Sequence, residues 1–590
     1  MSYIKSWKTI FGIWWKPVLA LLIPFALLPL IILYDCKESR CGYVVLWMAF
    51  YFMFEPIPLA VTALLPVAAF PMLGLLTTTE ACTPYMKDTI MMYVGSLTLA
   101  VAVEHCNLHK RIALKVLLII GTGARWLMLG FMTTTMFLSM WISNTATTAM
   151  MVPIVDAVLD ELEKEEKKTT LKSDGSAISM VTIRSNTSSQ SVWSTEMNKN
   201  PFQISVQLSN ASNSGAKKDY RHLRDSLLLS IAYAANCGGT GTVIGSGPNL
   251  VFKGLVEELY PDSNELTFAS WLIYNSPVMV ICVFLCWIGL QLFYQPCCFK
   301  DDAKTEAAAR NAVLKSYQEL GSITFHEASV ATLFLLVVFL WFLRDPQFID
   351  GWSTYMLNGR GIRDATPAIG VCLLLFIIPS KPSLTEYSPP LLNWRTAQRK
   401  IPWGVLLLLG SGFVVADAAK KSHLSVWLSS QLSYLNFLSP AVICIILTFM
   451  ASILTEVISN MSMATIMLPV VSEMAEAVKV HPFFLMLPVT IGCSFAMILP
   501  VGNPSNAIVF DASTMKTFDM MKPGVILKIL CCIVELFMIQ TLGVALFNLQ
   551  TFPDWANKSL VADPLTSINW TVLANVSSIA NTTMTTLQNG

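Results

Sequence analysis

The chain has 590 residues, of which 54% are hydrophobic and only 13% charged, and its mean hydropathy is +0.58. A soluble domain of this length does not need so apolar a composition, which excludes a soluble enzyme or a soluble binding module. The formal net charge of +1 points to no particular partner, and we expect no nucleic acid among its ligands.

Long apolar runs recur from one end of the chain to the other. Runs of roughly 17–25 residues are long enough to cross a hydrocarbon core about 30 Å thick as helices. In lipid the backbone must satisfy its own hydrogen bonds, and the alternation typical of a membrane β-barrel is absent. We therefore predict an all-α polytopic membrane protein. Clear runs are Trp15–Tyr34, Val44–Val61, Phe325–Leu343, Thr366–Pro379 and Val525–Leu546.

The first predicted unit comprises helices within residues 1-125. Lys5, Lys8 and Lys16 lie before or at the start of the first apolar run and no cleavable signal pattern follows them, so the positive-inside rule places the N-terminus in the cytoplasm. Two cysteines, Cys36 and Cys41, flank a short polar loop, and the sequence leaves a disulfide between them open. Glu55 and Glu104 fall inside apolar runs, where a carboxylate marks a transport pathway or an interior pair, or is a buried acid held by a neighbouring hydroxyl or a helix N-terminus.

Two segments, 126-160 and 441-476, have apolar flanks but a polar centre. Each is either one long helix or two short helices that meet partway across the bilayer as a re-entrant hairpin, with its tip buried in protein or facing a wet cavity. At such a tip the polar side chains cap the second helix, whose free amides attract an anion. Glu456 lies in the second segment, and we expect it near a cation site. The central triplets are Ser143-Asn144-Thr145 and Ser459-Asn460-Met461.

Two further segments, 226-256 and 482-512, are interrupted by glycine and proline. Such breaks expose carbonyl oxygens that suit a hard cation such as Na⁺, although a packing kink or a small-residue helix interface has a similar composition. Neither Trp126–Val155 nor Ser226–Phe252 contains Lys, Arg, Asp or Glu. An anion bound there needs amides, hydroxyls and co-bound cations to balance its charge.

The first hairpin segment and its neighbours recur at a nearly constant offset, whereas the two broken-helix segments correspond only after one residue of slippage and removal of the polar insert. Gly95-Ser96 reappears as Gly410-Ser411, and Ser139 is matched by Thr455. The copies are separated by an odd number of predicted crossings, so we expect an inverted repeat, the architecture of many secondary transporters. A polar stretch at 161-225, which we expect to be a disordered cytoplasmic insert, divides the two halves, and 257-440 contains scaffold helices and the start of the second repeat.

The chain ends with a predicted last transmembrane helix at 523-550 and a polar tail at 551-590. Four glycosylation acceptors in this tail predict an extracellular C-terminus. The acceptors are Asn557, Asn569, Asn575 and Asn581.

The sequence resembles the divalent-anion:sodium symporter family, which includes the sodium-dicarboxylate and sodium-citrate cotransporters and their insect INDY relatives. The resemblance covers nearly the whole chain. It is carried by Leu138–Pro153, Asn107–Leu114, Pro248-Asn249, Pro402-Trp403-Gly404 and Phe552–Ala556.

This resemblance implies an elevator-type carrier with about eleven transmembrane helices. The hairpins at 126-160 and 441-476 and the broken helices at 226-256 and 482-512 would form the transport domain, and the remaining helices the scaffold. It further implies sodium-coupled transport of carboxylates such as succinate and citrate across the plasma membrane, a homodimer surrounded by lipid, and no organic cofactor. We expect no enzymatic activity, because we see no nucleophile-base pair.

The family's site residues map onto this sequence position by position. The implied substrate-binding residues are Ser143, Asn144, Thr145, Ser459, Asn460, Met461, Thr240, Pro248 and Pro504. The implied sodium-binding residues are Ser139, Ser143, Asn144, Gly239, Thr242, Asn249, Thr455, Ser459, Asn460, Gly502 and Asn506.

Three alternatives remain open at this stage. His105 and Cys106 resemble the insect branch, one member of which is thought to exchange anions without sodium, so a sodium-independent carboxylate exchanger is one alternative. A sodium-sulfate cotransporter is another. The third, from a different class, is a membrane enzyme or receptor that uses the polar tips for other work.

Overall fold

The computed structural model describes residues 2–121, 123–160, 164, 222–294, 303–346, 349–356, 362–383, 385, 387–432 and 437–556. Within these residues all regular secondary structure is helical, apart from one isolated bridge between Pro379 and Pro390. The all-α prediction is therefore confirmed for the described part of the chain. Most of the 161-225 insert and all four glycosylation acceptors lie outside it.

The helices before the insert include the first predicted hairpin. They are α1 (Ser2–Leu33), α2 (Lys37–Phe54), α3 (Leu59–Thr62), α4 (Leu65–Met72), α5 (Thr78–Cys82), η1 (Thr83–Met86), α6 (Asp88–His105), α7 (Leu108–Ile120), α8 (Ala124–Ser139) and a helix over residues 144–160.

The helices after the insert begin with the first broken helix and continue into the central part of the chain. They are a helix over residues 222–238, α11 (Gly247–Leu259), α12 (Phe268–Tyr294), α13 (Ala303–Glu319), α14 (Phe325–Phe342), α15 (Trp352–Tyr355), α16 (Ala365–Ile377), α17 (Trp394–Lys400), α18 (Trp403–Lys421) and α19 (Leu424–Leu432).

The last part of the chain contains the second hairpin and the second broken helix. Its helices are α20 (Pro440–Leu454), α21 (Asn460–Ala477), α22 (Pro482–Ser494), η4 (Pro500–Gly502), α23 (Pro504–Ala512), α24 (Thr517–Met538), the π-helical turn η5 (Ile539–Gly543), α25 (Val544–Phe547) and η6 (Asp554–Ala556).

Six helical stretches of the described chain are long and apolar enough to cross a membrane, and four further apolar helices are shorter. A polytopic membrane protein is consistent with this, whereas the count of about eleven transmembrane helices stays a prediction. One predicted run is wrong as a single helix. Val44–Val61 breaks after Phe54, where Glu55 adopts φ 46°, because Pro56 and Pro58 cannot continue the helical hydrogen bonds.

Prolines inside the long helices free a carbonyl four residues earlier, and side chains of neighbouring helices bond to these carbonyls. Pro24 of α1 frees the Ala20 carbonyl, which accepts a hydrogen bond from Tyr51 Oη at 2.5 Å. Pro488 of α22 and Pro523 of α24 likewise free carbonyls. Those of Phe484 and Asp519 accept from Cys444 Sγ at 3.4 Å and from Tyr294 Oη at 3.1 Å. Each of these bonds joins two helices and gives the freed carbonyl a partner.

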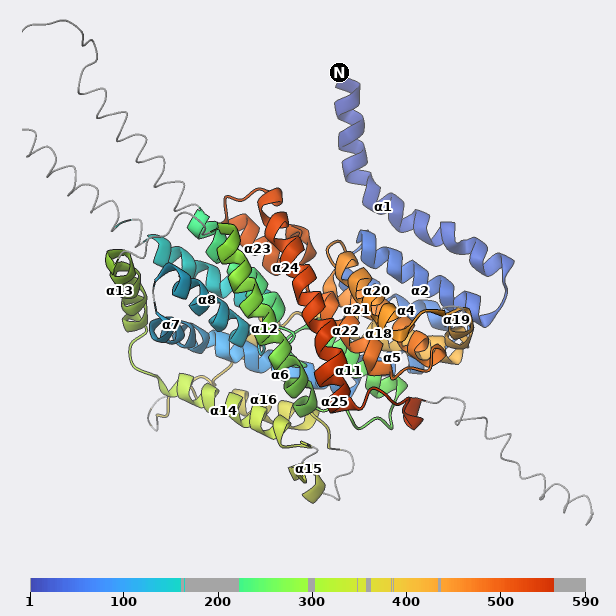
Figure 1. Ribbon diagram of the computed structural model, residues 1–590. Helices are drawn as coiled ribbons and strands as arrows, with labels where there is room; N and C mark the ends of the chain where they lie inside the picture. Colours follow the sequence, from blue (N-terminus) through green and yellow to red (C-terminus); the bar gives the residue numbers. More distant parts are fainter. Residues whose placement is uncertain are drawn as a thin grey trace, which may run out of the picture.

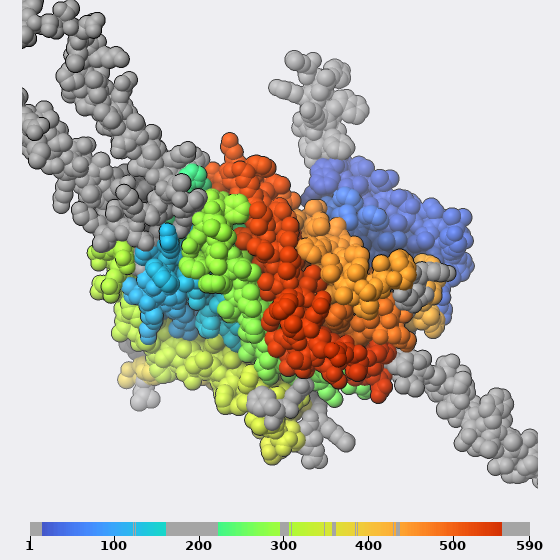
Figure 2. Space-filling view, viewed as in Figure 1, coloured from blue at the N-terminus to red at the C-terminus, as the bar shows by residue number. Residues whose placement is uncertain are grey.

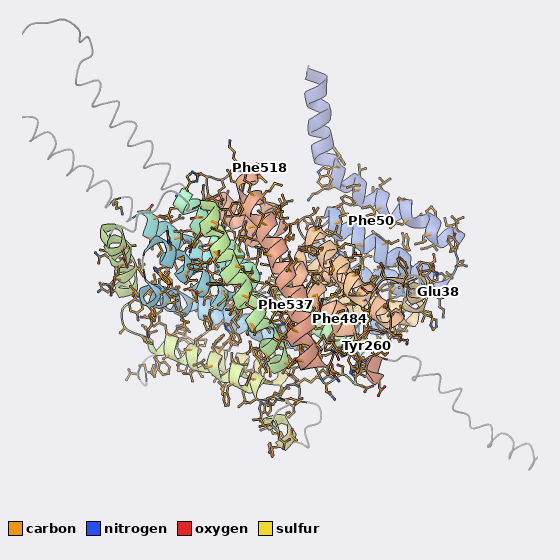
Figure 3. All side chains as sticks on the ribbon, in the orientation of Figure 1. Glu38, Phe50, Tyr260, Phe484, Phe518 and Phe537 are labelled. Carbon is orange, nitrogen blue, oxygen red and sulfur yellow. The ribbon has the colours of Figure 1, made fainter. Side chains whose placement is uncertain are left out.

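The helix α24 crosses the middle of the view in Figure 1, between α12 on one side and the second hairpin on the other. The first hairpin and α7 lie beyond α12, and α1 packs along α2 at the other end. The space-filling view in Figure 2 shows α24 on this face, flanked by α12 and α20. Phe518 and Phe537, labelled in Figure 3, are exposed on α24, as expected for a helix that borders lipid.

Candidate functional site

The first polar segment consists of two helices and not one. The helix α8 ends at Ser139, residues 140–143 are non-helical, and a second helix begins at Asn144. The Ser139 hydroxyl lies 2.7 Å from Asn144 Oδ1 and 2.9 Å from the Ala235 carbonyl oxygen. Three oxygen atoms therefore converge at this tip. The hydroxyl has only one proton, so it can donate to only one of the two acceptors at a time. The bond to Ala235 joins the hairpin to the first broken helix.

The second polar segment repeats this arrangement 316 residues later. The Thr455 hydroxyl follows α20 and lies 2.8 Å from Asn460 Oδ1, at the start of α21, and 2.8 Å from the Cys493 carbonyl oxygen. In both copies a buried hydroxyl contacts the asparagine five residues ahead and a carbonyl at the break of a broken helix. The same hydrogen bonds therefore recur in the register that the sequence repeat predicts.

The two broken helices are also equivalent. Asn249, in the first turn of α11, donates Nδ2 hydrogen bonds to the carbonyls of Gly239 (2.9 Å) and Thr242 (2.7 Å). Asn506, in the first turn of α23, donates to the carbonyls of Ala496 (2.9 Å) and Leu499 (3.1 Å). Each asparagine closes the unwound loop that precedes its own helix and fixes the direction of the loop carbonyls.

The two asparagines differ in their side-chain oxygens. Asn249 Oδ1 is buried and has no hydrogen-bond partner, whereas Asn506 Oδ1 accepts from Asn236 Nδ2 at 3.2 Å. A buried acceptor without a donor is costly unless a ligand completes it. The first loop therefore offers an oxygen that a cation would satisfy.

Asn236 is the central residue that sequence reasoning missed. It donates to the Ala496 carbonyl at 2.7 Å and accepts from Asn503 Nδ2 at 2.7 Å, so it connects the two broken helices. The residue is fully buried in the helix over 222–238. An asparagine inside an apolar helix, two residues before a glycine pair, was the available signal.

The loop between residues 239 and 247 lies against both hairpin tips. A side chain at Gly239 would overlap the Asn144 carboxamide, and one at Gly247 would meet Met461 at 3.0–3.1 Å. Ser246, the N-cap of α11, lies 3.3 Å from Ser494 at the end of α22, oxygen to oxygen. The N-termini of α11 and α21 thus lie together, and each adds partial positive charge.

Glu456 follows Thr455 at the second tip, and both of its carboxylate oxygens have hydrogen-bond donors. Its carboxylate accepts hydrogen bonds from the backbone amides of Met497, Ile498 and Leu499 at 2.9–3.1 Å. Lys528 of α24 pairs with it at 2.5 Å, and both side chains are buried. We expected Glu456 near a cation site. It does border the second loop, but its oxygens already bind these donors, so it supports the loop and is not a free ligand.

The remaining predicted residues lie at or beside the two tips. Ser143 caps the second helix of its hairpin, with its hydroxyl 3.4 Å from the Ala146 amide, whereas Ser459 makes no side-chain cap bond. Thr242 donates to the Met140 carbonyl and Thr240 to the Cys237 carbonyl. Pro248 is the second residue of α11 and Pro504 the first of α23. Gly502 adjoins Glu456, and Thr145 is half-buried.

Glu55, Glu104 and the cysteine pair of the first unit all lie away from the two tips. Glu104 pairs with Lys400 at 2.6 Å at the surface, and Glu55 is exposed, so neither lies at the tips. Cys36 and Cys41 are both free thiols in the structure.

Comparison of the sequence with known proteins places the chain in a family. The family model described as "Sodium:sulfate symporter transmembrane region" matches residues 13–549. The chain belongs to the sodium:sulfate symporter family. This confirms the family suggested by the sequence motifs.

Relatives within the sodium:sulfate symporter family align over nearly their full length. The Na(+)/citrate cotransporter of Rattus norvegicus is 40% identical, covering 94% of this chain and 98% of its own. The Na(+)/citrate cotransporter of Mus musculus is 41% identical, covering 92% of this chain and 97% of its own. The Na(+)/dicarboxylate cotransporter 3 of Homo sapiens is 37% identical over 96% and 97%.

Proposed function

We propose that this family member is a sodium-coupled symporter of di- and tricarboxylates such as succinate and citrate. The observation that carries the proposal is the convergence of hydroxyl, carboxamide and carbonyl oxygens at two equivalent tips, around Ser139 and Thr455. Hard cations bind such oxygen clusters. The relatives named Na(+)/citrate and Na(+)/dicarboxylate cotransporters agree with this assignment. We assign no enzymatic step and no organic cofactor.

The anion would bind where the helix N-termini meet. The substrate carboxylates would accept from the exposed amides and hydroxyls at the starts of the helix over 144–160 and of α21, with Thr240 and the Pro248 and Pro504 starts nearby. Asn144 and Asn460 each use Oδ1 to accept from the preceding hydroxyl, which directs the carboxamide Nδ2 elsewhere as a donor. The remaining assigned contacts are Ser143, Thr145, Ser459 and Met461.

Sodium would occupy the two oxygen clusters beside the broken helices. In the first, the ligands would come from Ser139, Ser143, Asn144, Gly239, Thr242 and Asn249, whose buried Oδ1 has no protein donor. In the second, they would come from Thr455, Ser459, Asn460, Gly502 and Asn506. Because no lysine or arginine lies within 126–155 or 226–252, the bound cations would supply the charge that a dicarboxylate needs.

Transport would proceed by an elevator motion of the hairpins and broken helices against the remaining helices, in a homodimer at the plasma membrane. Contacts between the two groups would then change during the cycle. Lys253 of α11 pairs with Asp364 before α16 at 2.9 Å, and Arg344 pairs with the same carboxylate at 2.8 Å. This motion requires the Lys253–Asp364 pair to break in one of the two end states.

Uptake of radiolabelled citrate, succinate and sulfate into expressing cells, with sodium replaced by choline, tests the proposal. We expect saturable citrate or succinate uptake that is lost in choline. Uptake that persists in choline would instead identify a sodium-independent exchanger, and sulfate uptake without carboxylate uptake a sodium-sulfate cotransporter. Purified protein that moves none of these anions into liposomes would reject the transport function.

A further inference from the structure

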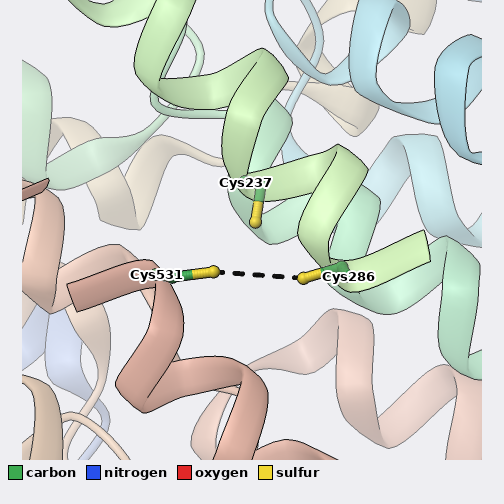
Figure 4. Close-up of side chains that lie close together, drawn as sticks. All are labelled: Cys237, Cys286 and Cys531. Carbon is green, nitrogen blue, oxygen red and sulfur yellow. Dashed lines mark hydrogen bonds between the residues drawn. The ribbon is translucent and has the colours of Figure 1, made fainter. Parts of the chain in front are cut away.

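Three cysteines that are far apart in the sequence meet in the protein interior. Cys237 ends the helix over 222–238, Cys286 lies on α12 and Cys531 on α24. Figure 4 shows their side chains directed toward one another. The three sulfur atoms lie within 4.8 Å of one another, with 3.9 Å between those of Cys286 and Cys531, and all three residues are fully buried.

This distance matches metal coordination. Sulfur ligands about 2.3 Å from one metal ion lie roughly 3.8–4.0 Å apart in tetrahedral or trigonal geometry. A shift of less than about 1 Å would bring all three sulfurs to that spacing. The sulfur atoms come from three separate helices, so a bound ion would hold these helices together.

One neighbouring buried cysteine, Cys282, lies one helical turn before Cys286 on α12 and also interacts with Cys531, although it is outside the group of three sulfur atoms within 4.8 Å of one another. Two other buried cysteines nearby have different partners. Cys532 Sγ lies 3.4 Å from the Ser452 hydroxyl, and Cys444 Sγ donates to the Phe484 carbonyl. These residues fill space and bond locally, as buried cysteines usually do. Convergence of three thiols therefore distinguishes the Cys237–Cys286–Cys531 cluster from ordinary core packing.

We propose that Cys237, Cys286 and Cys531 form a binding site for one soft, thiophilic metal ion, with Cu⁺ as the biological candidate. An all-sulfur ligand set favours Cu⁺ and other soft ions over the hard Na⁺. Binding replaces S–H bonds by metal–sulfur bonds, and each thiol that becomes a thiolate releases its proton to solvent. No oxidation step is involved.

The site is placed to control the first broken helix. Cys237 directly follows Asn236, and its carbonyl accepts hydrogen bonds from the Thr240 amide (3.1 Å) and hydroxyl (2.7 Å) at the start of the unwound loop. A metal ion that fixes Cys237 to α12 and α24 would restrain this loop. On the proposed function, it would slow sodium-dependent uptake.

Titration of purified protein with Cd²⁺, under reducing conditions free of added thiols, tests the site. Cys531→Ala and Cys532→Ala form a matched pair, because the two residues are adjacent, buried and of equal size. We expect wild-type protein and C532A to bind one more Cd²⁺ per chain than C531A, with a thiolate-to-metal absorption band that C531A lacks. C286A and C237A should lose the same band.

Equal Cd²⁺ binding by C531A and wild type, or an equal loss in C532A, would overturn the proposal. X-ray absorption at the cadmium edge of the unmutated protein gives a second measurement that needs no variant, and oxygen or nitrogen in the first shell of the added ion would also reject it. Neither measurement depends on transport. The metal site can therefore be tested even if the proposed symport function fails. The uptake assay likewise tests symport even if no metal binds.

Discussion

The two hairpin and broken-helix units share their hydrogen bonds but differ in charge. In the first unit the position after Ser139 is Met140, and the loop carries no ionisable side chain. In the second the equivalent position is Glu456, which binds three loop amides and pairs with Lys528. The first loop is held by neutral bonds alone, and the second by a buried ion pair as well.

This difference separates the tasks of the two loops. The first keeps a buried carboxamide oxygen, Asn249 Oδ1, without a donor, whereas the matching oxygen of Asn506 is already bonded and the open atom beside it is the Ser505 hydroxyl. A loop that must bind and release a cation benefits from an open acceptor and few fixed charges. We therefore expect the first unit to control sodium affinity more strongly, and the second unit to be the more rigid.

The largest effect should come from Lys528→Met, which leaves the Glu456 carboxylate buried without its cation. Removing one partner of a buried pair costs about 3–5 kcal/mol. We expect a marked loss of thermal stability of the detergent-purified protein and poor surface expression.

A double-mutant cycle provides the control. Adding Glu456→Gln to Lys528→Met removes the uncompensated charge, so the double variant should recover part of the lost stability. A single Lys528→Met variant as stable as wild type would show that the ion pair does not support the second loop.

The next largest effect should come from replacing the asparagines that begin the second helix of each hairpin. Asn144→Ala and Asn460→Ala remove the carboxamide assigned to the anion and the acceptor of the preceding hydroxyl. We expect each to abolish citrate and succinate uptake while surface expression persists. Asn393→Ala is a matched control, since Asn393 is an exposed helix cap at the start of α17. Near-normal kinetics in either site variant would remove that residue from the site.

A smaller effect should distinguish the two sodium sites. Ser139→Ala deletes one hydroxyl and Thr455→Ala deletes a hydroxyl together with a methyl group; the hydroxyl alone is worth about 1 kcal/mol, or roughly a fivefold change in an equilibrium constant. We expect the sodium concentration for half-maximal uptake to rise in both variants, and more in Ser139→Ala because Glu456 still holds the second loop. An unchanged value in either would reject that hydroxyl as a ligand. A larger shift in Thr455→Ala would reverse the comparison.

The smallest effect should come from an exposed pair. Lys400 and Glu104 are 2.6 Å apart at the surface, where such pairs contribute less than about 1 kcal/mol. Lys400→Met should leave thermal stability and uptake close to wild type. A loss as large as that of Lys528→Met would mean that burial does not explain the contrast between the two pairs.

The sequence alone determined the helical membrane class, the two polar tips and the register of the repeat. Composition and the length of the apolar runs decide the membrane class. The polar tips and the register follow from the residue types at Ser139 and Asn144, which recur at the same spacing as Thr455 and Asn460. The family followed from the same motifs.

Only the tertiary structure decided how these local signals combine. It joined Asn236 to the second broken helix, paired Glu456 with Lys528, and brought Cys237, Cys286 and Cys531 together. The partners in these contacts are 49 to 294 residues apart in the sequence, so neither periodicity nor a local motif can pair them. They meet because apolar helices pack wherever their faces fit, and buried polar groups and thiols then bond to whatever that packing places beside them.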